Sequence, residues 1–130
     1  MREIKFRVWD KLSERMIYPH NDNQQHFIID LNGQFHNLQN GSGGDDYVIQ
    51  QYTGLNDNND DPIYEGDILK NHYDVGNNII GQVLYESDHG GYIFQWKRKG
   101  RGQDYKNLNC DVAFESVIVG NIFEQSELLK

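Results

Sequence analysis

Apolar and polar residues alternate at the start of the chain, which is typical of a β-strand with one buried face. Ile4, Phe6 and Val8 alternate with charged residues, and this period of two predicts a half-buried strand. An apolar run over 16–18 follows a polar turn, and Pro19 ends it because proline cannot donate a ladder hydrogen bond. The opening of the chain therefore predicts a β-hairpin.

A second hairpin and a flexible loop follow. Asn32 and Gly33 separate the extended runs 26–31 and 34–38, and Asn-Gly favours a hairpin turn because both positions accept a positive φ. The segment 40–46 has no apolar residue, which predicts a flexible loop. This loop predicts a boundary between an N-terminal β subdomain (1–44) and a barrel-like subdomain (45–130). One compact unit is the alternative.

The rest of the chain also consists of short extended runs. Strands are predicted over 47–52, 63–69 (with a bend at 65–67), 79–86, 92–97 and 117–119. The polar stretch 99–109 predicts a loop, 112–114 a short strand or turn, and Ser126 the start of a half-turn through Leu129. Short strands separated by turn signals predict a mainly β fold, with an N-terminal meander or hairpin region, a C-terminal SH3-like β-barrel and a short helical tail.

Composition excludes several classes of protein. The chain of 130 residues has no apolar stretch of 18 residues, so no transmembrane helix is expected. Its charged first residues do not resemble a signal peptide. Cys110 is the one cysteine and cannot form an internal disulfide, which fits a reducing cytoplasm. We therefore expect a cytoplasmic protein that does not bind a membrane.

The acidic residues are concentrated in one part of the sequence. The net charge of -8 argues against general nucleic-acid binding. However, Met16 to Leu69 contains no Lys or Arg, and the remaining residues carry a net charge close to zero. This basic-free segment indicates a solvated face or an acidic surface that binds a host protein with a basic groove, in which case binding would weaken with salt. Its nine acids are Asp22, Asp30, Asp45, Asp46, Asp57, Asp60, Asp61, Glu65 and Asp67.

Basic residues gather instead between 97 and 106, next to aromatic ones. The basic residues are Lys97, Arg98, Lys99, Arg101 and Lys106, and the aromatic ones are Tyr92, Phe94, Trp96 and Tyr105. Aromatic and cationic side chains on a barrel hairpin are typical of single-strand nucleic-acid binding. The strand period of Tyr92, Phe94 and Trp96 indicates instead that these three share a core.

The acidic turn after residue 56 has the spacing of a calcium loop but not its pattern. Asp57, Asn59 and Asp61 alternate as the first ligands of an EF-hand loop do. Such a loop also needs glycine at its sixth position and glutamate at its twelfth. These positions hold Pro62 and Ile68, so no EF-hand calcium site is expected.

Other chemical motifs are also missing from the sequence. His26 and His36 could face each other across the predicted hairpin, but a zinc site usually needs a third protein ligand. The sequence contains no phosphate loop, dinucleotide fingerprint or Gly-x-Ser-x-Gly nucleophile motif. We therefore expect no catalytic residue, no cofactor and no metal.

Three segments of the chain are similar to a known family. They are Met1–Asp10, Gln51–Asp57 continuing to Ile63–Leu69, and Val119–Glu124 with Glu127–Leu129. In order and spacing they resemble the YopX family of bacteriophage and prophage proteins, over the full chain. The resemblance implies a mostly β, phage-encoded cytoplasmic protein with no assigned biochemical activity. Family members tend to have an Asn-Gly turn where this chain has Asn58–Asp61 without a glycine.

The glycines and acids of these motifs indicate a structural role. Glu65, Gly66 and Asp67 lie where a strand must bend, since glycine permits the bend and the Asp67 carboxylate can accept backbone hydrogen bonds. Gly54 ends the preceding strand, and Gly120 indicates a bulge in the closing strand. A catalytic pair of Glu65 and Asp67 is the alternative, but no histidine or nucleophile lies near them in the sequence.

The sequence therefore predicts a non-enzymatic phage or prophage accessory protein that acts through contacts with a host or phage protein. The alternative is a small barrel that binds nucleic acid through the region 92–106. Homo-oligomers are a further option, because the open strand edges of a small β domain can pair. The candidate interaction surface consists of Trp96, Lys97, Arg98, Lys99, Arg101 and Lys106.

Overall fold

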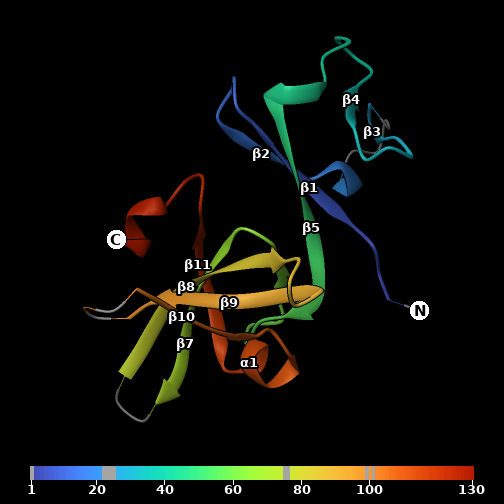
Figure 1. Cartoon of the computed structure of the whole chain (residues 1–130). Coiled ribbons are helices and arrows are strands. Elements are labelled where there is room, and N and C mark those ends of the chain that lie inside the picture. The colour runs from blue at the N-terminus through green and yellow to red at the C-terminus, as the bar shows by residue number, and fades with distance from the viewer. Residues whose placement is uncertain (1, 22–25, 75–76, 99, 101) are drawn as a thin grey trace. The chain divides into compact units, whose positions relative to one another are not determined.

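The computed structural model describes residues 2–21, 26–74, 77–98, 100 and 102–130, which we call the described residues. Figure 1 labels its elements in chain order. Proximity of Cα atoms divides the chain into two compact units, Glu3–Gln51 (unit 1) and Tyr52–Lys130 (unit 2). This division falls within strand β5 (Tyr47–Asn56), whereas the sequence predicted a boundary after residue 44.

Unit 1 is built from two antiparallel hairpins and the first half of β5. Its other elements are β1 (Phe6–Asp10), β2 (Arg15–Ile17), β3 (Phe27–Ile29), β4 (Phe35–Asn37) and the 3-10 turns η1 (Pro19–Asn21) and η2 (Gly44–Asp46). Strand β1 lies between β2 and β5, and β3 pairs with β4. Both hairpins predicted for this part of the chain are confirmed.

The core of unit 1 includes the fully or largely buried side chains of Val8, Ile17 and Phe35. Val8 lies opposite Ile17 in the register of β1 and β2. The prediction of a half-buried first strand is wrong at Arg7, which is 3% exposed. Its Nε atom donates a 2.8 Å hydrogen bond to Gln50 Oε1 on β5. A guanidinium that is removed from water needs another hydrogen-bond partner, and Gln50 supplies one.

Unit 2 contains the second half of β5 and a five-stranded antiparallel sheet (Figure 1). Its elements are β6 (Pro62–Tyr64), β7 (Asp67–Asp74), β8 (Asn77–Glu86), β9 (Gly91–Lys97), β10 (Gln103–Asn107), α1 (Cys110–Phe114), β11 (Ser116–Asn121) and the 3-10 turn η3 (Ser126–Leu129). The sheet order is β10-β9-β8-β7-β11, while β6 pairs with β5. The fold is therefore mainly β, as predicted.

The core of unit 2 lies on one face of this sheet. It is formed by Ile63, Leu69, Val83, Phe94, Val112 and Ala113. Tyr92 and Trp96 pack against it from the same strand as Phe94. The period of two in β9 thus predicted correctly that its aromatic side chains share a core.

Two predictions about local structure in unit 2 are wrong. The stretch 99–109, predicted as a loop, contains strand β10, because an edge strand whose residues are exposed or half-buried needs few apolar residues. The segment 112–114, predicted as a strand or turn, belongs to helix α1. Asn109 caps this helix by accepting a 3.0 Å hydrogen bond from Val112 N at its side-chain oxygen. The short helical turn near the C-terminus is confirmed as η3.

A membrane-spanning helix is not found in the described part of the chain, where no helix has the length and apolar character to cross a bilayer.

Candidate interaction surface

The motif at 65–67 forms the turn between β6 and β7. Gly66 has φ +87, a conformation that residues with a Cβ rarely adopt. Asp67 is 2% exposed, and its Oδ2 atom accepts a 2.8 Å hydrogen bond from Tyr64 N across the turn. Gly66 N donates to Val83 O of β8, and Gly66 O accepts from Ile122 N. The turn therefore fixes where β6, β7 and the segment after β11 meet.

Asp57 organises the turn before β6 in a similar way. It is 5% exposed, and its Oδ1 atom accepts 2.9 Å hydrogen bonds from Asn59 N and Asp61 N. Its Oδ2 atom accepts from Ile118 N on β11 at 2.9 Å. Asp60 has φ +63, the left-handed conformation that a glycine would otherwise supply. The spacing that resembled a calcium loop thus belongs to a turn held by one carboxylate.

The prediction that Gly54 ends β5 is wrong. Strand β5 continues to Asn56, although Gly54 has φ +89. The register of β5 and β6 shifts between Tyr52 and Asn56. The glycine therefore permits a bulge within the strand rather than its end.

The predicted bulge at Gly120 is present, as the register of β11 and β7 shifts between Ile118 and Gly120. A Cβ atom at Gly120 would lie 2.6 Å from Gln125 Oε1. Asn121 then accepts at Oδ1 from the N–H groups of Phe123 and Glu124, at 3.0 and 2.9 Å. The closing motif thus forms the turn that leads to η3.

The two histidines of the second hairpin do not face each other. The register places Ile28 opposite His36, while His26 O accepts from Leu38 N. His36 Nε2 lies instead 2.8 Å from Asp30 Oδ2. This hydrogen bond, and then the N–H of Gln34, hold the pKa of the Asp30 carboxyl below its ordinary value. In the described residues no group of three or more His, Cys, Asp or Glu side chains is placed to hold a metal ion.

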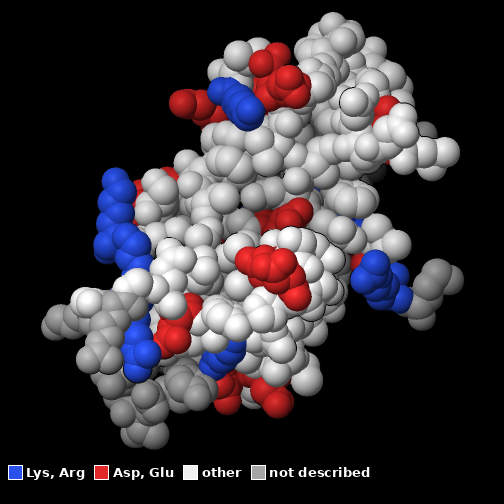
Figure 2. Space-filling model, viewed as in Figure 1, with Lys and Arg blue, Asp and Glu red and all other residues white. Residues whose placement is uncertain are grey.

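Several acids of the basic-free segment take part in hydrogen bonds within the protein. Asp30, Asp57 and Asp67 use their carboxylates on backbone N–H groups, and Asp60 Oδ1 accepts from Asn56 Nδ2 at 2.9 Å. Figure 2 shows acidic and basic side chains on the visible face of each unit. Four of the nine acids of this segment therefore serve turns, and Asp22 lies outside the described residues.

The predicted cationic cluster is also divided. Lys106 lies opposite Phe94 in the register of β10 and β9, on the face of the sheet that carries the core. Burial lowers the pKa of the Lys106 ammonium, and the Glu115 carboxylate opposes this shift. Arg98 Nε lies 3.6 Å from Asp104 Oδ2. Lys97 and Gln95 lie on the opposite face of the sheet, because successive side chains of a strand alternate between the two faces.

Two members of the predicted cluster, Lys99 and Arg101, lie outside the described residues. The other candidate, Trp96, packs against the core together with Tyr92 and the fully buried Phe94. These three aromatic rings therefore do not form an exposed stacking platform. Tyr105, on β10, is 51% exposed, and its ring centroid lies 4.9 Å from that of His89.

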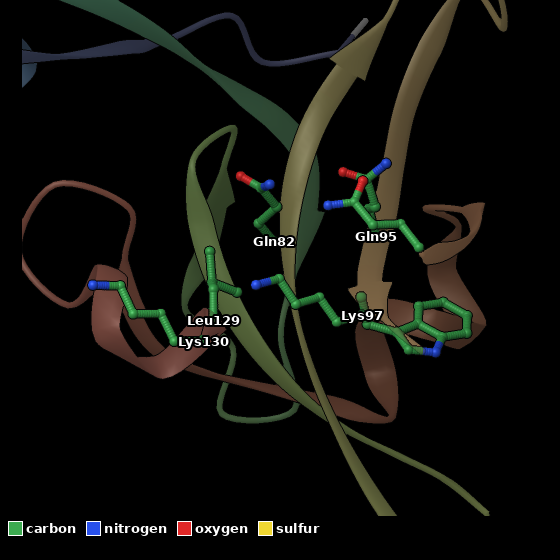
Figure 3. A pocket seen from close by; sticks show the side chains of 7 residues that line it. Gln82, Gln95, Lys97, Leu129 and Lys130 are labelled. Atoms are coloured by element: carbon green, nitrogen blue, oxygen red, sulfur yellow. The ribbon is translucent and has the colours of Figure 1, made fainter. Parts of the chain in front are cut away.

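A hollow of about 230 Å³ lies on the sheet face opposite the core, next to η3 (Figure 3). Gln82 of β8 lies opposite Gln95 of β9, and Lys97 lies opposite Gln103 of β10. Lys130 and Leu129 reach the hollow from the C-terminal turn. The predicted interaction surface contained two of the lining residues, Lys97 and Trp96. Gln82 and Gln95 belong to no motif in the sequence, and only the register of β8 and β9 brings them together.

These polar side chains are not used inside the protein. Within the described ranges, none of Gln82, Gln95, Lys97, Gln103 and Lys130 has a side-chain hydrogen bond or ion pair. No Asp or Glu side chain is among the described residues that line the hollow. In Figure 3 the Lys97 side chain extends toward Leu129, beside Gln82. The hollow therefore offers ammonium and amide donors to an acidic group from outside.

Strand β10 is an edge of the sheet, with β9 as its hydrogen-bonded neighbour. Arg98 N donates to Gly102 O, and Leu108 N donates to Tyr92 O. Because hydrogen-bonded pairs alternate along antiparallel strands, these two bonds set the direction of every backbone group between them. The residues whose N–H and C=O point away from β9, toward the open edge, are Gln103, Tyr105 and Asn107.

Helix α1 carries Cys110, whose thiol is free and whose side chain is exposed.

Comparisons with known proteins agree with this architecture. The YopX protein family matches residues 5–130. The crystal structure of protein EF1440 from Enterococcus faecalis is similar, with 25% sequence identity, a TM-score of 0.58 and coverage of 100% of both chains. A comparison with curated proteins gives no match. Because the family match extends over nearly the whole chain, and includes residues 5–10 of the first motif and the other two motifs in full, the chain belongs to the YopX protein family.

Proposed function

We propose that this protein is a non-enzymatic binding module that acts through contacts with another protein. As the resemblance implies, it would serve a phage or prophage in the cytoplasm of a bacterial host. The hollow on unit 2 is the observation that carries the proposal, because its polar side chains lie together and have no side-chain hydrogen bond or ion pair with the described part of the chain. Such groups are typical of a surface that binds a partner rather than of a folding core.

The chemistry of the hollow defines the partner that fits it. Lysine ammonium groups donate only, and carboxamides both donate and accept. Lys97 and Lys130 lie at one hollow, and no Asp or Glu is among the described residues that line it. An acidic side chain of the partner is therefore the complement. Charge-assisted hydrogen bonds of this kind are stronger than neutral ones. The partner is therefore a protein with an exposed Asp or Glu.

The acids of the family motifs support a non-enzymatic role. Asp57 and Asp67 are buried, and their oxygens accept backbone N–H groups. A carboxylate that is occupied in this way is poorly suited to take up a substrate proton, since a general base needs access to that proton. The burial of Asp67 supports the structural role that the sequence predicted for it.

A pull-down with the tagged full-length protein from lysate of a bacterial host tests the proposal. We expect a partner that is recovered at low salt and lost at high salt, because screening weakens ionic contacts. Lys97→Glu reverses one charge at the hollow and should abolish recovery of that partner. Lys11→Glu reverses an exposed charge in unit 1 and should leave recovery unchanged. Equal recovery with Lys97→Glu, or no specific partner at all, would contradict the proposal.

A mobility-shift titration at low salt separates this proposal from nucleic-acid binding. We expect no shift of single-stranded or duplex nucleic acid, because the aromatic side chains of β9 pack in the core. A shift that disappears when Lys97 and Arg98 are replaced by alanine would instead favour nucleic acid as the partner.

A further inference from the structure

We infer that β10 pairs antiparallel with β10 of a second copy of this chain, about a two-fold axis that passes through Tyr105. This inference is independent of the proposed partner at the hollow, because it uses the backbone of the sheet edge. Three features of the described residues carry it: the direction of the backbone groups, the symmetry of their positions and the order of the charges.

The open edge offers a symmetric set of backbone groups. Gln103, Tyr105 and Asn107 direct their N–H and C=O groups away from β9, and no backbone hydrogen bond within the described chain uses them. Tyr105 is at the centre of this set. When two copies pair antiparallel at Tyr105, that residue faces itself, and Gln103 of each copy faces Asn107 of the other. Every outward N–H then meets an outward C=O.

The charges of β10 match in the same register. Asp104 lies one residue before Tyr105, and Lys106 lies one residue after it. The two-fold axis therefore places Asp104 of each copy directly opposite Lys106 of the other. Opposite charges that face each other across antiparallel strands are stabilising, whereas like charges are destabilising. A parallel arrangement in register would instead place Asp104 beside Asp104.

The side chains leave the edge accessible. Gln103 and Asn107 are exposed, and Tyr105 is 51% exposed. Asp104 lies 3.6 Å from Arg98 through one carboxylate oxygen, and a carboxylate has further lone pairs for a second cation. A lysine on an edge strand often discourages pairing, but here Asp104 supplies its complement. The two hollows would lie on the same side of the joined sheet, since a two-fold axis perpendicular to a sheet preserves its faces.

The expected dimer is weak and depends on concentration. Two strands of five residues bury less surface than the roughly 1,200 Å² that a stable interface needs. Analytical ultracentrifugation of the full chain over a range of concentrations should therefore show a monomer–dimer equilibrium. A wild-type chain that stays monomeric up to its solubility limit would overturn the inference.

Backbone variants test the use of the edge. Tyr105→Pro removes an outward N–H without removing a bond to β9, since proline is tolerated at such edge positions. It should weaken dimerisation by about tenfold or more. Tyr105→Thr keeps the N–H and suits a strand, so it should dimerise more strongly than the proline variant. Equal dimerisation of both variants would overturn the inference.

Charge variants test the register. Asp104→Lys gives each copy two lysines beside the axis, and Lys106→Asp gives each copy two aspartates, so each variant alone should be monomeric. An equimolar mixture should form a heterodimer, because every facing pair is then of opposite charge. The proposed register would be overturned if either variant alone dimerised like the wild type, or if the mixture formed no heterodimer.

A covalent test is available if a charge variant fails to fold. In a Cys110→Ser background, Tyr105→Cys places two thiols opposite each other on the axis, where Cα atoms about 5.5 Å apart permit a disulfide. Mild oxidation should give a covalent dimer. Gln103→Cys, which faces Asn107 instead, should give much less. Equal cross-linking of the two variants would contradict the two-fold axis at Tyr105.

Discussion

Asp57 and Asp67 show how single carboxylates hold the turns of this fold. Each is almost fully buried, and each accepts hydrogen bonds from backbone N–H groups close in sequence. Asp57 also accepts from Ile118 N on β11, far along the chain. A residue that could be taken for a metal ligand or a catalytic acid is therefore part of the framework.

Replacement of Asp57 by alanine should destabilise the protein substantially. The change leaves the N–H groups of Asn59, Asp61 and Ile118 without their acceptor, at a cost of about 2 kcal/mol or more. Asp57→Asn retains one acceptor oxygen and should have an intermediate effect. Asp45→Ala removes an exposed acid of the same segment and should change the free energy of unfolding by less than about 0.5 kcal/mol. Urea denaturation measures all three, and equal effects of Asp57→Ala and Asp45→Ala would contradict this role.

Most residues of the hollow could not be predicted from the sequence. Lys97 was identified because it belongs to a visible run of basic residues. Gln82 and Gln95 have no chemical signature, and they meet only because the register of β8 and β9 aligns them. Lys130 reaches the hollow through η3, a contact between distant segments that periodicity does not encode.

At the scale of elements, the hairpins of the chain were predictable, and the edge strand β10 was not. Alternation and turn residues located β1, β2, β3, β4, β8 and β9 well, since one face of most of these strands is buried. Strand β10 contains one aromatic residue and four polar ones. It forms because β9 supplies its hydrogen-bond partners, so its existence depends on a neighbour rather than on its own hydrophobic pattern.

Gly81 lies in the middle of β8, and no turn or motif in the sequence marks it. A Cβ atom there would collide with Gln95 O and would lie 2.8 Å from a ring carbon of Phe94. Gly81→Ala should therefore force β8 and β9 apart, at a cost of about 1–3 kcal/mol. Gly91→Ala is the matched control, because its Cβ would have no neighbour within 4 Å. Thermal melts measure the difference. A melting temperature of Gly81→Ala equal to or above that of Gly91→Ala would contradict this expectation and show that the two strands adjust freely.

At the scale of the whole molecule, the two units have cores of different size. Among the described residues, the cluster in unit 2 contains six buried residues, and the cluster in unit 1 contains three. Stability rises with the apolar surface that a chain removes from water, so small cores are marginal. The unequal cores indicate that the two units differ in their capacity to fold alone.

Two fragments test this difference. The fragment 52–130 should show a cooperative thermal transition, because its core draws on residues from Leu55 onward. The fragment 1–51 should show none, because its core is small. Circular dichroism of both fragments beside the full chain measures this. A fragment 52–130 without a transition, or a fragment 1–51 with one, would contradict the expectation.

The exposed thiol on α1 makes the protein unusually easy to follow in solution. Cys110 is the one cysteine of the sequence, and it is free and exposed. A maleimide dye or a nitroxide would therefore attach at a single position of the native chain, without any substitution. Energy transfer between donor- and acceptor-labelled copies, or a distance between two spin labels, would then report on self-association inside unfractionated host lysate.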